Sequence, residues 1–215
     1  KIKNQVILLD QYYRKIAVIF FKKEKKICPL LEKMRMIGCD ILEHFKDKES
    51  VLIINSNERF EETVAVSEGI ALSNYTFNKY KTKKSQNILK TIYLKNVPNK
   101  KSITELQNLI DSVYITRDLI NEPFSHLTAI DLANKSKNLS DQIGIKTTVF
   151  NKKKIESLKM GGLLAVNKGS LDDPTFTIME WSPKKAKNKN PIILVGKGIV
   201  YDTGGLSLKP TKNSM

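Results

Sequence analysis

Short apolar runs alternate along this chain with segments of helical periodicity, and this alternation constrains the fold more than any other feature. Strands that alternate with amphipathic helices favour an α/β architecture. The predicted strands are 5–9, 16–21, 51–54, 88–94, 145–150, 163–167, 175–181 and 191–195. The predicted helices are 29–45, 59–74, 102–120, 129–138 and 152–160.

The polar segment 96–101, which contains Pro98, is the best candidate for a domain boundary. Ser102 follows it, with Glu105 three residues later, a spacing typical of a helix N-terminus with a capping box. Thr128 is the expected N-cap of the next helix. We therefore expect an N-terminal α/β domain over residues 1–100, and a second region over 101–215 that opens with a linker helix.

The formal net charge of +15 comes almost entirely from lysine, because the chain has only four arginines. A strongly basic chain is one indication of nucleic-acid binding. Recognition of phosphates and bases favours arginine, however, because its planar guanidinium binds them in a bidentate way. A solvated, lysine-rich surface is therefore the preferred interpretation, with nucleic-acid binding as the alternative.

Histidine and cysteine are too scarce for most metal and nucleophile motifs. His44 and His126 are the only histidines, and Cys28 and Cys39 are the only cysteines, with no Cys-x-x-Cys pair. This composition argues against an imidazole-based zinc site in the chain, and it favours a reducing, cytoplasmic compartment. No apolar run approaches the roughly 18–20 residues of a membrane span.

The segment 161–170 contains glycines and Lys168, as phosphate-binding loops do. The residue before Lys168 is Asn167, whereas the phosphate-loop pattern requires glycine there. A buried strand over 163–167 that ends in a turn is the preferred interpretation.

A glycine-rich turn after the predicted strand 191–195 carries the most informative chemistry. It places Asp202 between Lys197 and Lys209, and its four glycines let the backbone approach a bound group closely. Lys197 lies just past the carboxyl end of a predicted apolar strand. In parallel sheets, residues at this end of the strands often form the binding site. From these residues alone, anion binding, metal binding and a purely structural turn all remain open.

The motifs VGKG (195–198), YDTGG (201–205) and SLKP (207–210) closely resemble the metal-binding signature of the leucyl aminopeptidases, the two-metal cytosol aminopeptidases. Two further segments are similar to parts of that family's catalytic domain, and one is similar to the end of its N-terminal domain. They are TRDLINEP (116–123) with Leu127 and Thr128 after it, MGGLLAV (160–166) and FNKYK (77–81). The resemblance covers roughly residues 60–215.

The resemblance implies a macro-like N-terminal α/β domain, followed by the first part of a mixed-sheet α/β catalytic domain. By position, Lys197 would bind one divalent metal ion through its amine, and Asp202 would bridge two. A lysine amine binds a metal only in its neutral form. Lys209 would remain charged and stabilise the oxygen of the substrate carbonyl. The expected cofactors are two Zn²⁺ or Mn²⁺ ions, with a bicarbonate ion as a possible general base.

The implied activity is the release of N-terminal amino acids, such as leucine, from peptides with a free N-terminus by a metal-activated water. A cytoplasmic homo-hexamer without membrane contact is expected. In the family, an aspartate, a second aspartate and a glutamate complete the metal site, and these lie beyond Met215. We therefore expect these 215 residues to be an inactive N-terminal fragment. The alternatives are a homologue that binds DNA through the basic N-terminal domain, and a non-catalytic homologue that lacks the later ligands.

Overall fold

The computed structural model describes residues 5–21, 24–57, 59–83, 88–95 and 99–200. The chain divides into two compact units, residues 1–118 and 119–215. Both contain helices and small sheets, so the predicted α/β class is confirmed. The predicted domain boundary after residue 100 stays a prediction.

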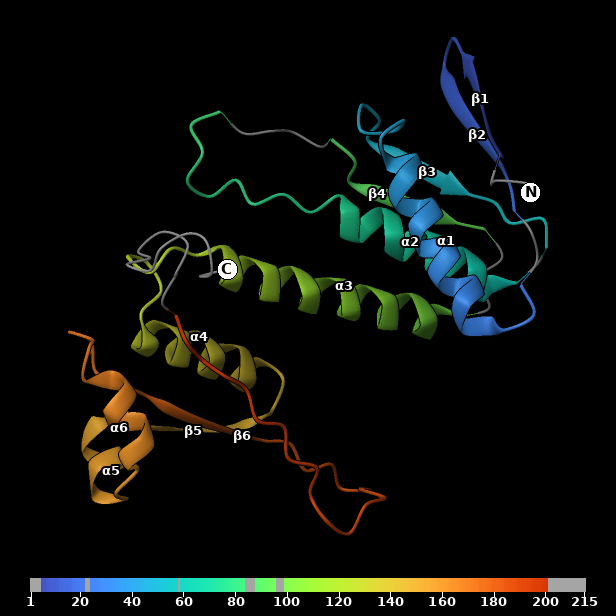
Figure 1. The fold of residues 1–215 in the computed structure, drawn as a ribbon. Helices are drawn as coiled ribbons and strands as arrows, with labels where there is room; N and C mark the ends of the chain where they lie inside the picture. The colour runs from blue at the N-terminus through green and yellow to red at the C-terminus, as the bar shows by residue number, and fades with distance from the viewer. Residues whose placement is uncertain (1–4, 22–23, 58, 84–87, 96–98, 201–215) are drawn as a thin grey trace. The chain divides into compact units, whose positions relative to one another are not determined.

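The first unit contains two pairs of strands and three helices (Figure 1). Strands β1 (Gln5–Gln11) and β2 (Arg14–Phe20) form an antiparallel hairpin. Strands β3 (Ser50–Ile53) and β4 (Thr91–Leu94) pair in parallel. The helices are α1 (Ile27–Leu42), α2 (Phe60–Ser73) and α3 (Lys100–Asn121). Because α2 lies between β3 and β4 in the chain, the parallel pair is a β-α-β unit.

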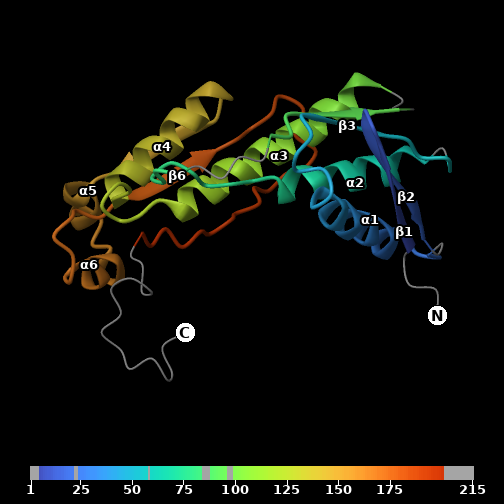
Figure 2. The same cartoon turned by 90° about the horizontal axis from the view of Figure 1, so that it is seen from above.

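The core of the first unit lies where α1 and α2 pack against each other, and Figures 1 and 2 both draw them side by side. Gly38 of α1 and Gly69 of α2 permit this close packing. A Cβ atom on Gly38 would overlap the backbone oxygen of Val66, and one on Gly69 would overlap that of Arg35. The core residues are Leu30, Met34, Ile37, Ile41, Leu42, Ala65, Val66, Ile70 and Leu89.

The second unit packs helix α4 (Ala129–Gln142) against an antiparallel pair of strands, β5 (Lys146–Phe150) and β6 (Phe176–Glu180). Two short helices, α5 (Lys152–Ser157) and α6 (Gly161–Asn167), connect these strands. Within the described ranges, no helix is long and apolar enough to cross a membrane.

Two predicted strands are wrong. The segment 163–167 lies in α6, because a run this short has no decisive periodicity and leucine and alanine favour helix. The segment 191–195 forms no strand, and its apolar residues Ile192 to Val195 are 77–93% exposed. An apolar run becomes a strand only where a neighbouring strand accepts its backbone hydrogen bonds.

The N-terminus of α3 also differs from the prediction, because the helix begins at Lys100 rather than at Ser102. The side-chain oxygen of Asn99 accepts a hydrogen bond from the backbone N–H of Ser102 at 3.0 Å. Asparagine is as good an N-cap as serine, so the earlier of two possible caps starts the helix. The predicted cap of α4 at Thr128 is confirmed.

Candidate functional site

Helix α4 is held against the strand pair β5–β6 by contacts near both of its ends. The hydroxyl of Thr175 donates a hydrogen bond to the backbone oxygen of Ala129 at 3.1 Å, at the start of α4. At the other end of the helix, the Ser140 hydroxyl contacts the sulfur of Met179 at 3.4 Å. The rings of Phe150 and Phe176 stack across the strand pair. These contacts fix α4 on the strands at both ends.

The start of α4 is held by a reciprocal pair of hydrogen bonds. The backbone N–H and hydroxyl of Thr128 donate to the Asp131 carboxylate at 3.0 and 2.6 Å, and the Asp131 backbone N–H donates back to the Thr128 hydroxyl oxygen. The hydrogen bonds from Thr128, chiefly that of its side chain, lower the pKa of Asp131. The sequence predicted Thr128 as the cap but did not identify Asp131 as its partner.

Glu122, at the end of the TRDLINEP segment, is also held in place by α4. Its side chain is only 5% exposed and forms an ion pair with Lys135 at 3.5 Å. A carboxylate with so little access to water requires a charged partner, and α4 supplies it. The residues that precede α4 are therefore anchored to this helix.

Lys197 lies in the segment 191–200, which forms neither helix nor strand. A Cβ atom on the neighbouring Gly198 would lie 3.8 Å from a methyl carbon of Leu132, which is ordinary van der Waals contact. The Lys197 side chain itself is exposed. Asp202 and Lys209, the other two predicted site residues, lie outside the described residues, so the predicted site stays a prediction.

The described residues do not by themselves fit a pair of metal ions. No three His, Cys, Asp or Glu side chains gather into a possible metal site in the part of the chain that the structure describes. Divalent metal sites usually require several nitrogen or oxygen ligands. Lys197 offers a single amine, so a metal ion at this residue would require further ligands.

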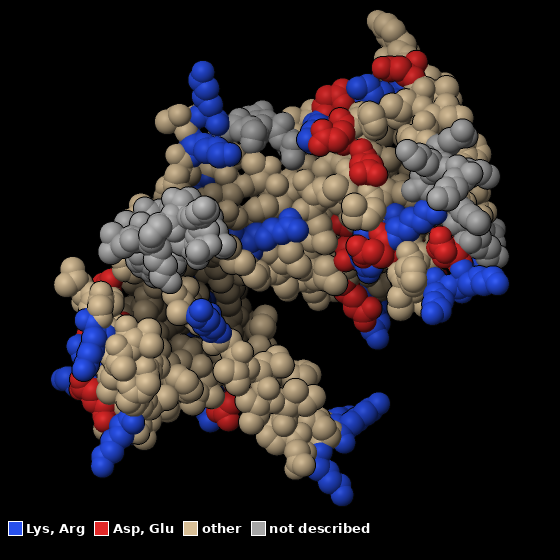
Figure 3. Space-filling view, in the orientation of Figure 1, with Lys and Arg blue, Asp and Glu red and all other residues tan. Residues whose placement is uncertain are grey.

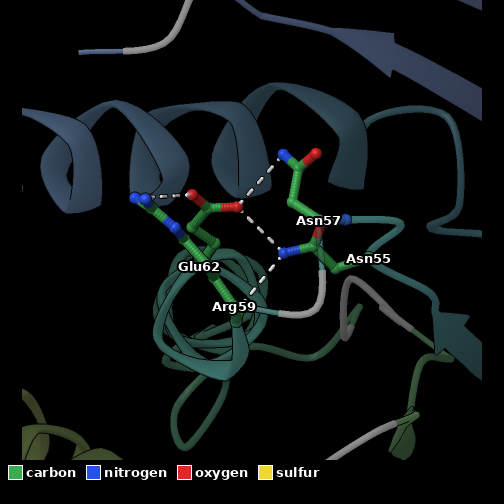
Figure 4. Close-up of polar contacts among 4 residues, drawn as sticks. All are labelled: Asn55, Asn57, Arg59 and Glu62. Carbon is green, nitrogen blue, oxygen red and sulfur yellow. Dashed lines mark hydrogen bonds and ion pairs between the residues drawn. The ribbon is translucent and has the colours of Figure 1, made fainter.

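A buried polar cluster, which the sequence reasoning missed, lies in the first unit where β3 leads into α2 (Figure 4). Glu62 is 3% exposed, and its carboxylate accepts hydrogen bonds from the side-chain amides of Asn55 at 2.9 Å and Asn57 at 3.5 Å. Arg59 lies 3.9 Å from the other carboxylate oxygen. The Asn55 amide also donates to the backbone oxygen of Arg59 at 3.0 Å.

This cluster occupies the carboxyl end of a parallel strand, where α/β folds often bind ligands. Here the Glu62 carboxylate occupies that position. One of its oxygens accepts hydrogen bonds from Asn55 and Asn57, and the other lies near Arg59. The cluster therefore serves to fix the loop between β3 and α2. The asparagines before the helix were the available signal, because asparagine commonly stabilises such turns.

On the face drawn in Figure 3, basic side chains are spread out rather than gathered in one stripe, and some of them lie beside acidic side chains. Ion pairs of the described residues include Lys15 with Asp47 at 3.2 Å and Lys152 with Asp173 at 3.0 Å.

Residues 114–215 match the family described as the cytosol aminopeptidase family, catalytic domain. A probable cytosol aminopeptidase of Clostridium tetani is 37% identical over 164 residues, which cover 73% of this chain and 34% of the relative. The chain thus spans about a third of that protein's length.

Solved structures show the same fold. A mutant of tomato leucine aminopeptidase matches 94% of this chain and 43% of its own, with a TM-score of 0.78 and 19% identity. The bottromycin maturation enzyme BotP in complex with Mn matches 84% of this chain and 40% of its own, with a TM-score of 0.68 and 18% identity.

Proposed function

We propose that this protein is part of a metal-dependent aminopeptidase, because residues 114–215 match the catalytic domain of the cytosol aminopeptidase family. The enzyme would release N-terminal amino acids, leucine among them, from peptides with a free N-terminus. The match over residues 114–215 is the observation that carries the proposal. It includes the whole glycine-rich turn with Lys197, Asp202 and Lys209.

The metal ligands of this chain would be Lys197 and Asp202. An amine and a carboxylate suit Zn²⁺ or Mn²⁺, and BotP, which shares the fold, has been solved with Mn. Bound divalent ions would polarise the peptide carbonyl and make a water molecule nucleophilic at neutral pH. The Lys197 amine would bind in its neutral form, and the Asp202 carboxylate would be shared between two ions.

Lys209 would act on the substrate directly. Its ammonium group would donate a hydrogen bond to the carbonyl oxygen of the scissile peptide bond, where negative charge develops in the transition state. Lys197 would thus be neutral and Lys209 charged, although the two lysines are close in sequence. The metal ions beside Lys197 and the substrate beside Lys209 would cause this difference.

We further propose that the 215 residues hydrolyse no peptide on their own, since one amine and one carboxylate leave each metal ion short of ligands. The active assembly would be a cytoplasmic hexamer, and bicarbonate would serve as the general base. DNA binding through the basic first unit remains the weaker candidate, because the basic side chains on the face drawn in Figure 3 are spread out and some of them lie beside acidic ones.

The metal-site proposal is tested by titrating the 215-residue chain with Mn²⁺ and following the free ion by electron paramagnetic resonance. We expect weak binding that is lost in Asp202→Asn and in Lys197→Met. Asp141→Asn removes an exposed carboxylate of α4 and should leave the binding unchanged. Equal binding by the wild type and Asp202→Asn would refute the assigned ligand.

A further inference from the structure

The C-terminus of α2 has a local cap but no local positive charge. The backbone N–H of Asn74, which keeps a right-handed helical conformation, donates to the backbone oxygens of Ile70 and Ala71, and the last turn of the helix contains no basic residue. The last carbonyl groups of a helix carry the negative end of its dipole. Further donors and a positive charge from another part of the chain would therefore stabilise this end.

Two side chains of α3 supply them. The Tyr114 hydroxyl donates a hydrogen bond to the backbone oxygen of Ala71, and the Arg117 guanidinium donates one to the backbone oxygen of Leu72. Burial raises the pKa of Tyr114, so its hydroxyl remains a donor at neutral pH. Arg117 places a permanent positive charge at the negative end of α2.

Tyr75 joins these two contacts into one cluster. The Arg117 guanidinium lies 5.4 Å from the centre of the Tyr75 ring, and the edge of that ring packs against Tyr114 with the ring centres 5.1 Å apart. The Tyr75 hydroxyl donates a hydrogen bond to the Asp118 carboxylate at 2.7 Å. All members lie in residues 71–75 and 114–118, inside the first unit.

We propose that Tyr75, Tyr114, Arg117 and Asp118 form a latch that closes the C-terminus of α2 and holds the last turns of α3 on the first unit. This assigns a role to Arg117 and Asp118, which belong to the TRDLINEP segment and to which the proposed metal site gives no role. The match to the catalytic domain begins at residue 114. Its first five residues, 114–118, therefore work within the N-terminal unit.

Hydrogen exchange of the 215-residue chain, resolved by peptide, tests the latch. In Arg117→Met we expect amides of residues 70–76 and 112–118 to exchange about tenfold faster, or more, because a hydrogen bond to a charged group is lost. Amides in the core of α1, around Ile37 and Ile41, should keep the wild-type rate. Lys101→Met removes a positive charge from the exposed first turn of α3 and should leave all three regions unchanged.

Arg117→Lys serves as a milder second variant, which keeps the charge but loses the planar group over Tyr75. Its local acceleration should lie between those of the wild type and Arg117→Met. The latch is refuted if neither variant accelerates exchange in residues 70–76. It is also refuted if α1 accelerates as much as the latch residues, since Arg117 would then act on the whole unit. Neither result depends on peptidase activity, so the proposed function is tested separately.

Discussion

At the scale of single residues, the first unit depends on two glycines that face each other's helix. Neither is required by an unusual backbone angle, because the only glycine among the described residues with a positive φ is Gly144. Gly38 and Gly69 are required by space, since a Cβ atom on either would overlap a backbone oxygen of the other helix. Backbone cannot move aside as a flexible side chain can.

We predict that Gly69→Ala destabilises the first unit by about 1–3 kcal/mol, the usual cost of forcing extra atoms into a packed core. The difference in unfolding free energy between the wild type and the variant is measured by urea unfolding, with hydrogen exchange of α1 as the probe. The control is Cys39→Ala, which changes a free, exposed residue of α1 and should alter stability by less than about 0.5 kcal/mol. An unchanged midpoint in Gly69→Ala would contradict the close packing of the two helices.

Glu62 provides a second prediction at this scale. Glu62→Gln places an amide where two asparagine amides donate, so the charge and the match of donors to acceptors are both lost. We expect a loss of about 1–3 kcal/mol in the free energy of unfolding of the first unit. The control is Glu61→Gln, which makes the same change at the exposed neighbouring position. An equal loss of stability in this control would contradict a specific contribution of the buried Glu62 carboxylate.

At the scale of elements, the sequence predicted helices well where an apolar stripe or a single clear cap marked them. The stripe of Leu30, Met34, Ile37 and Ile41 predicted α1 because apolar residues at this spacing share one helix face. Thr128 predicted the start of α4 because threonine is a preferred cap.

The two wrong strand predictions have different causes. The run 163–167 is too short for periodicity to separate strand from helix, and it became α6. The run 191–195 has the composition of a buried strand, yet a strand depends on neighbours that its own sequence cannot specify. Long-range partners, rather than intrinsic propensity, decide whether such a segment forms a strand.

Thr128→Val tests the cap of α4. We expect it to destabilise α4 by about 1 kcal/mol, because valine cannot accept the backbone hydrogen bond. The pKa of Asp131 should rise toward its ordinary value of 3.8, because its main cause of lowering is removed. Nuclear magnetic resonance titration of the Asp131 carboxylate measures this shift directly.

The pH dependence of the cap follows from the direction of that shift. A carboxylate with a lowered pKa stabilises the folded state above its unfolded pKa, and the effect is lost as pH falls through the folded value. The difference in stability between the wild type and Thr128→Val should therefore be largest near neutral pH and shrink under strongly acidic conditions. A difference that grows toward low pH would contradict this assignment.

At the scale of the whole molecule, the fold class followed from the alternation of strands and helices, whereas the candidate site followed only from motif resemblance. Composition and spacing left a metal site, an anion site and a structural turn equally open around Asp202. The described structure adds that Gly198, next to Lys197, lies in contact distance of Leu132 in α4. Among the described residues, no three His, Cys, Asp or Glu side chains gather into a possible metal site.

If the proposed function is right, this chain carries working site residues of a cytosol aminopeptidase. The most direct test replaces the matching part of the Clostridium tetani relative with residues 114–215 of this chain, which include Lys197, Asp202 and Lys209, with the parent protein measured in parallel. We predict that the chimera hydrolyses leucine p-nitroanilide in the presence of Mn²⁺, and that Lys209→Met lowers the rate about 100-fold. A folded chimera without activity beside an active parent, or one that Lys209→Met leaves unchanged, would contradict the claim.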